Sequence, residues 1–260
     1  GTGQKCTAAS RLIVHAKVLD AFTEGLVKAT EALRVGHALT DGTQIGPVVS
    51  EAQLAANLNW VERGRTDGAE LLTGGQRLER PTQGHYMAPA IFAGTRNDMA
   101  MNREEMFAPI TCLIKADNYA EALSIANDSQ FGLTAGIMTR SLSRASHFRA
   151  NMRAGCVMVN LPTAGTDYHV PFGGTKGSSY GAREQGRQVG ASCEMFAQNS
   201  CAAQRVAPGL ESGGAGEGGF GLQAIFRRIG PQIDLLKRDA RILGITGRVT
   251  DDGGHHGSAV

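Results

Sequence analysis

The residue best suited to covalent chemistry is Cys6, in the stretch GTGQKC at the start of the sequence. A helix-like run follows soon after it, and a thiolate just before a helix is stabilised by the N-terminal amides and the helix dipole. The same amides can stabilise an oxyanion that forms when the sulfur attacks a carbonyl. Gly3 would let the backbone approach a ligand closely. However, most lone intracellular cysteines are inert core residues, so both interpretations stay open for this stretch alone.

A second candidate is the stretch NREEMFAPIT, where the adjacent acids Glu104 and Glu105 precede Phe107 at the entry to a strand. A carboxylate there could accept hydrogen bonds from a sugar diol, and the phenyl ring could pack against a flat heterocycle. The alternative is a solvated pair of glutamates beside a core phenylalanine. The residue types therefore allow a nucleotide contact without requiring one.

A third candidate is the glycine-rich loop within residues 159–186, which follows a buried strand and carries Phe172. Such loops often approach ligands, but they also serve as tight turns. The order GxxxxGKS/T of a phosphate-binding loop is absent from it. His169 is interpreted as a polar loop residue, and Lys176 has no sequence partner that would identify it as a Schiff-base lysine.

The composition excludes several classes of protein. The chain has 260 residues, of which 42% are hydrophobic and 19% charged, and its net charge of +2 favours neither nucleic acid nor an anionic membrane as a partner. No signal peptide and no apolar run long enough to span a bilayer is visible, so a cytoplasmic location is expected. The cysteines form no CxxC pair, which argues against a disulfide framework and against a metal site: Cys6, Cys112, Cys156, Cys193 and Cys201.

Apolar spacing and capping residues predict the elements that must position these candidates. After a short apolar strand, the run 18–33 has apolar residues at helical spacing. Ser50, with Gln53 three residues on, has the spacing of a capping box for a helix from about 51 to 63. The stretch AELLTGGQRL at 69–78 is typical of a strand that leaves through a Gly-Gly turn into a hairpin.

Strands and helices alternate through the rest of the first 187 residues. Strands are predicted near 88–95, 108–116, 133–139 and 156–160, and helices near 118–128 and 141–155. Alternation with short connections indicates an α/β domain with a largely covered sheet over residues 1–187. Residues 188–260 form a glycine-rich tail with too few apolar residues for a core, and we expect this tail to be poorly ordered.

Together, three motifs resemble the aldehyde dehydrogenase superfamily in their order and approximate spacing: GQKCTAASRLIV, REEMFAPI and PFGGTKGSSYGAREQG. The resemblance covers residues 1–187 and implies the α/β catalytic domain of that fold. Within the superfamily, GTQIGPVVSEAQL and the stretch 159–181 look closest to the 2,5-dioxovalerate (α-ketoglutaric semialdehyde) dehydrogenases. This likeness implies oxidation of a short dicarboxylate semialdehyde, with NAD or NADP as the cofactor.

By this resemblance, Cys6 matches the family nucleophile. In the family, that cysteine attacks the aldehyde carbon to give a thiohemiacetal, hydride passes to the nicotinamide, and water hydrolyses the thioester that remains. Glu105 matches the acid that holds the nicotinamide ribose, and Phe107 the aromatic beside the nicotinamide ring. The FGP motif of the family is FAP here, so Ala108 is expected to disturb the nicotinamide pocket.

The resemblance also assigns a substrate channel and separates this chain from a whole enzyme. Phe172 falls where the aldehyde channel is lined, and Pro162 and Thr163 border the same channel. The Rossmann-type cofactor domain that precedes the cysteine motif in the family is missing, together with the glutamate general base and the amide that completes the oxyanion site. After REQGR at 183–187 the sequence departs from the family ending, which weakens oligomerisation by the family's route.

These features support more than one hypothesis about function. The first is a fragment of an NAD(P)-dependent aldehyde dehydrogenase that needs a separately supplied cofactor domain, so that the isolated chain is inactive. The alternative is a non-enzymatic truncated remnant that at most associates with intact subunits. A third is a residual thiol esterase that depends on Cys6. The expected partners are a small aldehyde and further copies of the chain, with no nucleic acid and no membrane.

Overall fold

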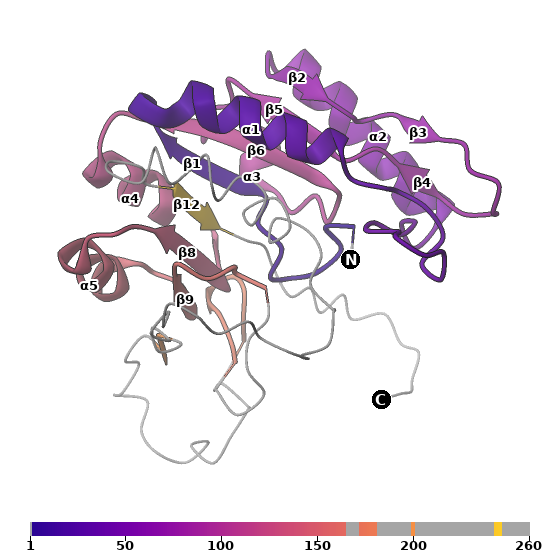
Figure 1. The fold of residues 1–260 in the computed structure, drawn as a ribbon. Coiled ribbons are helices and arrows are strands. Elements are labelled where there is room, and N and C mark those ends of the chain that lie inside the picture. Colours follow the sequence, from indigo (N-terminus) through magenta and orange to yellow (C-terminus); the bar gives the residue numbers. More distant parts are fainter. Residues whose placement is uncertain (1, 165–171, 181–198, 201–241, 246–260) are drawn as a thin grey trace.

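An eight-stranded sheet runs through the structure, a computed structural model that describes residues 2–164, 172–180, 199–200 and 242–245. The strand order is β11-β9-β8-β12-β1-β6-β5-β2 (Figure 1). The strands of this sheet are β1 (Arg11–His15), β2 (Glu70–Thr73), β5 (Ala90–Ala93), β6 (Ile110–Ala116), β8 (Thr134–Met138), β9 (Cys156–Val159), β11 (Asn199–Ser200) and β12 (Ile242–Ile245). Two smaller sheets pair β3 (Arg77–Leu78) with β4 (Tyr86–Met87), and β7 (Phe131–Gly132) with β10 (Thr175–Lys176).

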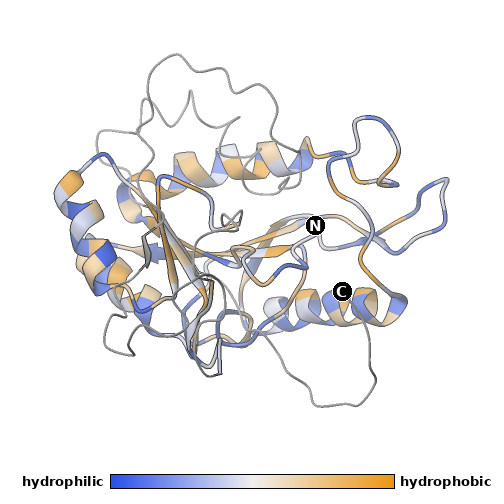
Figure 2. Ribbon diagram, turned by 90° about the horizontal axis from the view of Figure 1, so that it is seen from below, coloured by the Kyte–Doolittle hydropathy of each residue, from blue (hydrophilic) through white to orange (hydrophobic). Residues whose placement is uncertain are grey.

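Helices cover both faces of the large sheet. They are the 3-10 helix η1 (Ala16–Val18) and the α-helices α1 (Leu19–Glu31), α2 (Glu51–Thr66), α3 (Ala100–Arg103), α4 (Tyr119–Asn127) and α5 (Leu142–Asn151). Helix α1 packs on one face, while α2, α4 and α5 contribute to the clusters on the other (Figure 1). Along each helix, hydrophobic and hydrophilic residues are mixed, as a single buried face requires (Figure 2).

Strand β1 shows why this sheet is buried on both sides. Leu12 and Val14 pack in a cluster with Phe22 of α1, whereas Ile13 packs in another cluster with Phe148 of α5. Successive side chains of a strand point to opposite faces, so a continuous apolar run is stable only when both faces are covered. The structure is thus the mixed α/β fold that the alternating pattern indicates.

The four predicted helices are confirmed, and the runs near 118–128 and 141–155 form α4 and α5. The run 18–33 forms α1 just after η1, and α2 begins at Glu51 after the Ser50 N-cap. The Ser50 hydroxyl accepts a hydrogen bond from the Gln53 amide at 3.1 Å. The Gln53 side chain donates to the Asn57 side-chain oxygen at 2.8 Å, so it supports the first turns of α2 from within.

The hairpin predicted after the Gly-Gly turn is wrong in its pairing. The strand before the turn, β2, pairs antiparallel with β5, and the strand after it, β3, pairs with β4. Gly74 has a φ of +73°, and a Cβ on it would lie 1.8 Å from the carbonyl oxygen of Pro89. The glycine therefore serves a close approach to the chain just before β5, and the strand is directed to that partner.

The tail also departs from expectation at two segments, since residues 199–200 form the edge strand β11 beside β9. Residues 242–245 form β12 within the large sheet, although the tail was expected to be poorly ordered. The run ILGI is apolar and short, which suits a strand with a neighbour on each side. The boundary expected at Arg187 lies outside the described residues.

Candidate active site

Cys6 lies in a tight turn. The amide of Ala8 donates to the carbonyl oxygen of Lys5 at 2.9 Å, which closes the turn around the cysteine. The next element is the strand β1, and the first α-helix begins only at Leu19. The prediction that a helix N-terminus directly supports the thiolate is therefore wrong, because the apolar run after the turn enters the sheet as a buried strand.

The cysteines of the described residues differ in their exposure. Cys112 and Cys156 are buried, whereas Cys6 is half-buried, and all three are free thiols. Burial raises the pKa of the Cys112 thiol to about 12, so this sulfur stays protonated near neutral pH. Cys112 is thus an inert core thiol, and Cys6 is the cysteine of this part of the chain that is best placed to meet a ligand.

The Cys6 turn, which we define as residues 2–8, sits directly on the second motif. Gly3 has a φ of +71°, and a Cβ on it would lie only 2.0 Å from the carbonyl oxygen of Ala108. Only glycine fits this approach of one backbone to another. The contact seats the Cys6 turn against the segment that carries Glu105 and Phe107, although the two motifs are far apart in the sequence.

The side chain of Gln4 fixes the same turn from another direction. Its oxygen accepts a hydrogen bond from the Val49 amide at 3.0 Å and one from the Thr2 hydroxyl at 3.2 Å. The sequence analysis gave Gln4 no role, because a glutamine in a loop has no distinctive spacing. The contact ties the turn to the segment just before α2.

Burial alternates along the segment that carries the second motif. Met106 and Ala108 are 4% and 7% exposed and belong to the core cluster under α2, whereas Phe107 is 37% exposed. Phe107 has a φ of +50°, in the left-handed region that a bulky residue rarely adopts. The alternative of a core phenylalanine is therefore wrong, because its neighbours fill the core. Such strain is typical of functional sites.

The alanine in the FAP motif is accommodated by the packing. The positive φ falls on Phe107, and the Ala108 methyl group belongs to the core cluster with Met106 and Ile110. The Ala108 methyl group is thus packed within the core that the described residues form. Glu104, the first acid of the motif, forms an ion pair with Arg63 at 3.2 Å on the surface.

Thr163 joins the Cys6 turn from the loop after β9. Its hydroxyl donates to the carbonyl oxygen of Thr7 at 2.9 Å, and both threonines are buried. Asn160, with a φ of +56°, shapes this loop by exchanging two hydrogen bonds with the backbone of Thr139, at 2.8 and 2.9 Å. The structure therefore brings Thr163, with half-buried Pro162 beside it, to the residue next to Cys6.

Phe172 is held by a different set of contacts. It is half-buried, and the carbonyl oxygen of the following Gly173 would lie 1.8 Å from a Cβ on Gly155, which precedes β9. The loops of Thr163 and Phe172 thus join β9 at opposite ends. The described contacts bring Thr163 to the Cys6 turn, while Phe172 remains a predicted channel residue. His169 lies outside the described residues.

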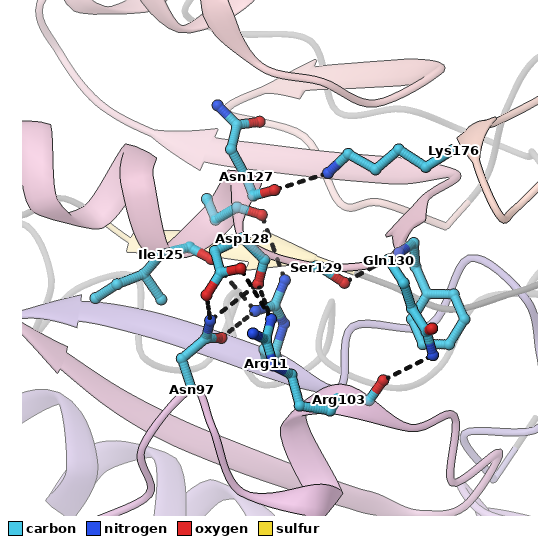
Figure 3. Close-up of polar contacts among 11 residues, drawn as sticks. Arg11, Asn97, Arg103, Ile125, Asn127, Asp128, Ser129, Gln130 and Lys176 are labelled. Carbon is cyan, nitrogen blue, oxygen red and sulfur yellow. Dashed lines mark hydrogen bonds and ion pairs between the residues drawn. The ribbon is translucent and has the colours of Figure 1, made fainter.

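A polar cluster lies at the end of α4, and Figure 3 shows its contacts. The Arg11 guanidinium, which is 3% exposed, donates to the side-chain oxygen of Asn97 and to the carbonyl oxygens of Ile125 and Ala126. Burial, and secondarily the charge of Arg103, lowers the pKa of Arg11 to about 10. Arg11 therefore remains charged near neutral pH and ties β1 to the end of α4.

Asp128 connects the same cluster to the second and third motifs. Its carboxylate accepts hydrogen bonds from Asn97 at 2.7 Å and from Arg103 at 3.0 Å. The hydrogen bond from Arg103 lowers the pKa of Asp128. Next to it, the carbonyl oxygen of Asn127 accepts a hydrogen bond from the Lys176 ammonium at 2.8 Å (Figure 3). Lys176 thus anchors β10 to the end of α4.

The site offers groups that fit a nicotinamide nucleotide. Phe107 presents an aromatic ring with part of its surface open, next to half-buried Glu105. The Thr7 hydroxyl, beside Cys6, is buried without a hydrogen-bond partner in the part of the chain that the structure describes. A buried hydroxyl is costly to leave unpaired, so this atom indicates a missing neighbour at the site.

Among the described residues, no group of three or more histidine, cysteine or acidic side chains is placed to hold a metal ion. None of the helices described is both long and apolar enough to cross a membrane.

The fold and the cysteine turn define the class of protein, and comparison with known proteins agrees. The chain belongs to the aldehyde dehydrogenase family, whose sequence model matches residues 1–198. The match extends beyond the end expected at residue 187. Among its relatives, the chain is 43% identical over 187 residues to the alpha-ketoglutaric semialdehyde dehydrogenase of Bacillus subtilis, covering 71% of this chain and 38% of that protein. It is 42% identical to the alpha-ketoglutarate semialdehyde dehydrogenase of Haloferax volcanii, covering 71% and 39%.

Solved structures show the same relationship. HpcC from Thermus thermophilus is 38% identical with a TM-score of 0.68, over 72% of this chain and 37% of that one. The NAD+ complex of an aldehyde dehydrogenase from Bacillus cereus is 32% identical with a TM-score of 0.65, over 67% and 35%. The chain therefore spans less than two fifths of the length of the relatives it matches.

Proposed function

We propose that this chain supplies the nucleophile and the substrate-facing loops of an NAD(P)-dependent aldehyde dehydrogenase that oxidises α-ketoglutaric semialdehyde to 2-oxoglutarate. The observation that carries the proposal is the seating of the Cys6 turn on the Phe107–Ala108 backbone and on Thr163. The names of the relatives at 43% and 42% identity support the choice of aldehyde.

In this proposal Cys6 carries the covalent chemistry. Its thiol gives its proton to water, the sulfur adds to the aldehyde carbon, and a thiohemiacetal forms whose oxyanion the turn amides stabilise. A bound NAD or NADP supplies a hydride acceptor. Loss of hydride leaves a thioester on Cys6, and water then cleaves the carbon–sulfur bond to release the carboxylic acid and restore the thiol.

The neighbouring residues position the reactants. Phe107 offers its exposed face to the nicotinamide ring, and Glu105 accepts hydrogen bonds from the ribose hydroxyls. Pro162, Thr163 and Phe172 border the path of the aldehyde. In this proposal residues 1–260 by themselves are inactive, because hydride transfer needs the acceptor held close to the thiohemiacetal.

The test is reconstitution in trans. The purified chain is mixed with the part of the Bacillus subtilis relative that precedes its cysteine motif, and the formation of reduced nicotinamide is followed with α-ketoglutaric semialdehyde, succinic semialdehyde and betaine aldehyde. We expect turnover only in the mixture, fastest with the first aldehyde, and none with Cys6→Ser. Equal turnover of the mixture with Cys6→Ser would contradict the role of Cys6.

The alternative is a non-enzymatic remnant that at most associates with intact subunits. A mixture that associates but gives no turnover with any aldehyde would support the remnant. Slow ester hydrolysis by the chain alone, lost in Cys6→Ser, would instead indicate a thiol esterase.

A further inference from the structure

The large sheet contains two strands that begin after the family match ends, the edge strand β11 and the interior strand β12. Strand β12, residues 242–245, lies between β8 and β1, whereas the family match ends at residue 198. It is paired on both sides, from Arg11↔Ile245 to Val14↔Ile242 with β1, and from Ile242↔Met138 to Ile245↔Ala135 with β8. A segment without a counterpart in the family sequence model thus occupies the middle of the family's sheet.

The direction of β12 also sets it apart. β1 runs parallel to β6, and β8 runs parallel to β9. Because β12 is antiparallel to both β1 and β8, those two strands point the same way and form the walls of a slot for a single strand. Residues of the family region form both walls of the slot, whereas β12, which occupies the slot, lies outside that region.

The slot cannot stand empty at low cost. Its walls are deeply buried: Ile13 of β1 and Ala135 of β8 are fully buried and belong to one core cluster that spans both walls. Without a strand between them, the facing amide and carbonyl groups of β1 and β8 would be unpaired within the core. In this structure β12 supplies the hydrogen-bond partners of both walls.

We propose that the space between β1 and β8 is a strand-acceptor site for the remaining part of an aldehyde dehydrogenase, and that residues 242–245 occupy it as a substitute. The length of the relatives supports this partner, since this chain leaves more than three fifths of each one uncovered. The buried, apolar walls of the slot suit an apolar strand. The inference rests on the proposed function, because the partner is the remaining part of the same enzyme.

In this proposal, β12 competes with a strand of the partner for the same slot. When the partner inserts its own strand, β12 has to leave, so the chain binds the partner less tightly than a chain whose tail cannot form the strand. A proline at position 243 removes an amide donor and cannot continue a strand that is paired on both sides. The matched control is Leu236→Pro, which places the same change in the tail outside residues 242–245.

The first experiment uses the unaltered chain and the cofactor-binding part of the Bacillus subtilis relative. Amide hydrogen exchange is measured by mass spectrometry with and without this partner. We expect β12 to be protected in the free chain and to exchange faster once the partner binds, while β1 and β8 stay slow in both states. Protection of β12 that is unchanged by a bound partner, or β12 that is unprotected in the free chain, would overturn the proposal.

The second experiment compares affinities by calorimetry. We expect Leu243→Pro to bind the partner about tenfold more tightly than the unaltered chain, a difference of about 1.4 kcal/mol, and Leu236→Pro to bind like the unaltered chain. Equal affinity of all three chains would overturn the competition. These readouts do not depend on turnover, so a displaced β12 without aldehyde oxidation would refute the proposed function and leave the strand-acceptor site intact.

Discussion

The Cys6 turn and the neighbouring polar cluster hold the motif loops in place by different physical means. The turn depends on shape, because Gly3 lets its backbone touch the carbonyl of Ala108 and Thr163 adds one neutral hydrogen bond. The Arg11 cluster, which we define as Arg11, Asn97, Arg103 and Asp128, depends on charge-assisted hydrogen bonds. The Cys6 turn is therefore positioned by contacts between groups that do not titrate. The segments joined by the Arg11 cluster are held by hydrogen bonds to groups that do titrate.

The largest effect is expected from a change of shape. In Gly3→Ala, the new methyl group collides with the Ala108 carbonyl, and the φ of +71° becomes strained. We expect a loss of about 3 kcal/mol in the free energy of unfolding, measured in urea, from overpacking and strain together.

The matched control is Gly94→Ala, where φ is +64° but no atom lies within 4 Å of the added Cβ. It carries the strain without the collision, so its loss should be about 1 kcal/mol. Equal losses in the two variants would show that the contact with Ala108 does not seat the turn.

The next effect tests the charged region. Replacing Arg11 by methionine keeps much of the buried volume but leaves Asn97 and two carbonyl groups without their donor. We expect a loss of about 2 kcal/mol in the free energy of unfolding. Arg63→Met, at an exposed ion pair with Glu104, should cost less than about 1 kcal/mol. A larger loss of stability in Arg63→Met than in the Arg11→Met variant would contradict the importance of the Arg11 cluster.

Asn160 combines both means, since it has a φ of +56° and exchanges two hydrogen bonds with Thr139. In Asn160→Gly only the hydrogen bonds are lost, and we expect about 1 kcal/mol. In Asn160→Ala the backbone is strained as well, and we expect about 2 kcal/mol. Thermal unfolding of the two variants separates the contributions, and identical melting temperatures would mean that strain plays no part in this loop.

The smallest effect concerns pH. The hydrogen bond from Arg103 lowers the pKa of Asp128 below its ordinary value, so the folded chain holds this carboxylate charged more readily than the unfolded chain does. Its stabilisation is present above that value and is lost as the pH falls through the lower folded pKa. Because the carboxylate is mostly exposed, the effect should stay below about 1 kcal/mol. Urea unfolding of Asp128→Asn should lack this acid-dependent part, whereas Gly3→Ala should keep it.

Local rules predicted most of the secondary structure. The capping residue Ser50 and the apolar spacing of 18–33 fix helices through contacts within a few residues, so α1 and α2 begin close to where the sequence places them. Continuous apolar runs likewise indicate strands such as β6, because a strand covered on both faces needs no alternation.

Such local rules did not predict contacts between residues that are distant in the sequence. The pairing of β2 with β5 depends on the close approach of Gly74 to Pro89, and the exposure of Phe107 depends on its positive φ. The resemblance to a family found the candidate residues Cys6 and Phe107. Only the structure shows that Gly3 brings these two motifs into contact.

The contact between Gly3 and Ala108 involves main-chain atoms on the Ala108 side. A carbonyl group is the same whichever side chain its residue carries. Lineages that diverge toward new aldehydes can therefore exchange the side chains that face the substrate while the reactive sulfur keeps the same position in the fold. A glycine at position 3 would then be required in every lineage, whereas the residues that line the channel would be free to vary.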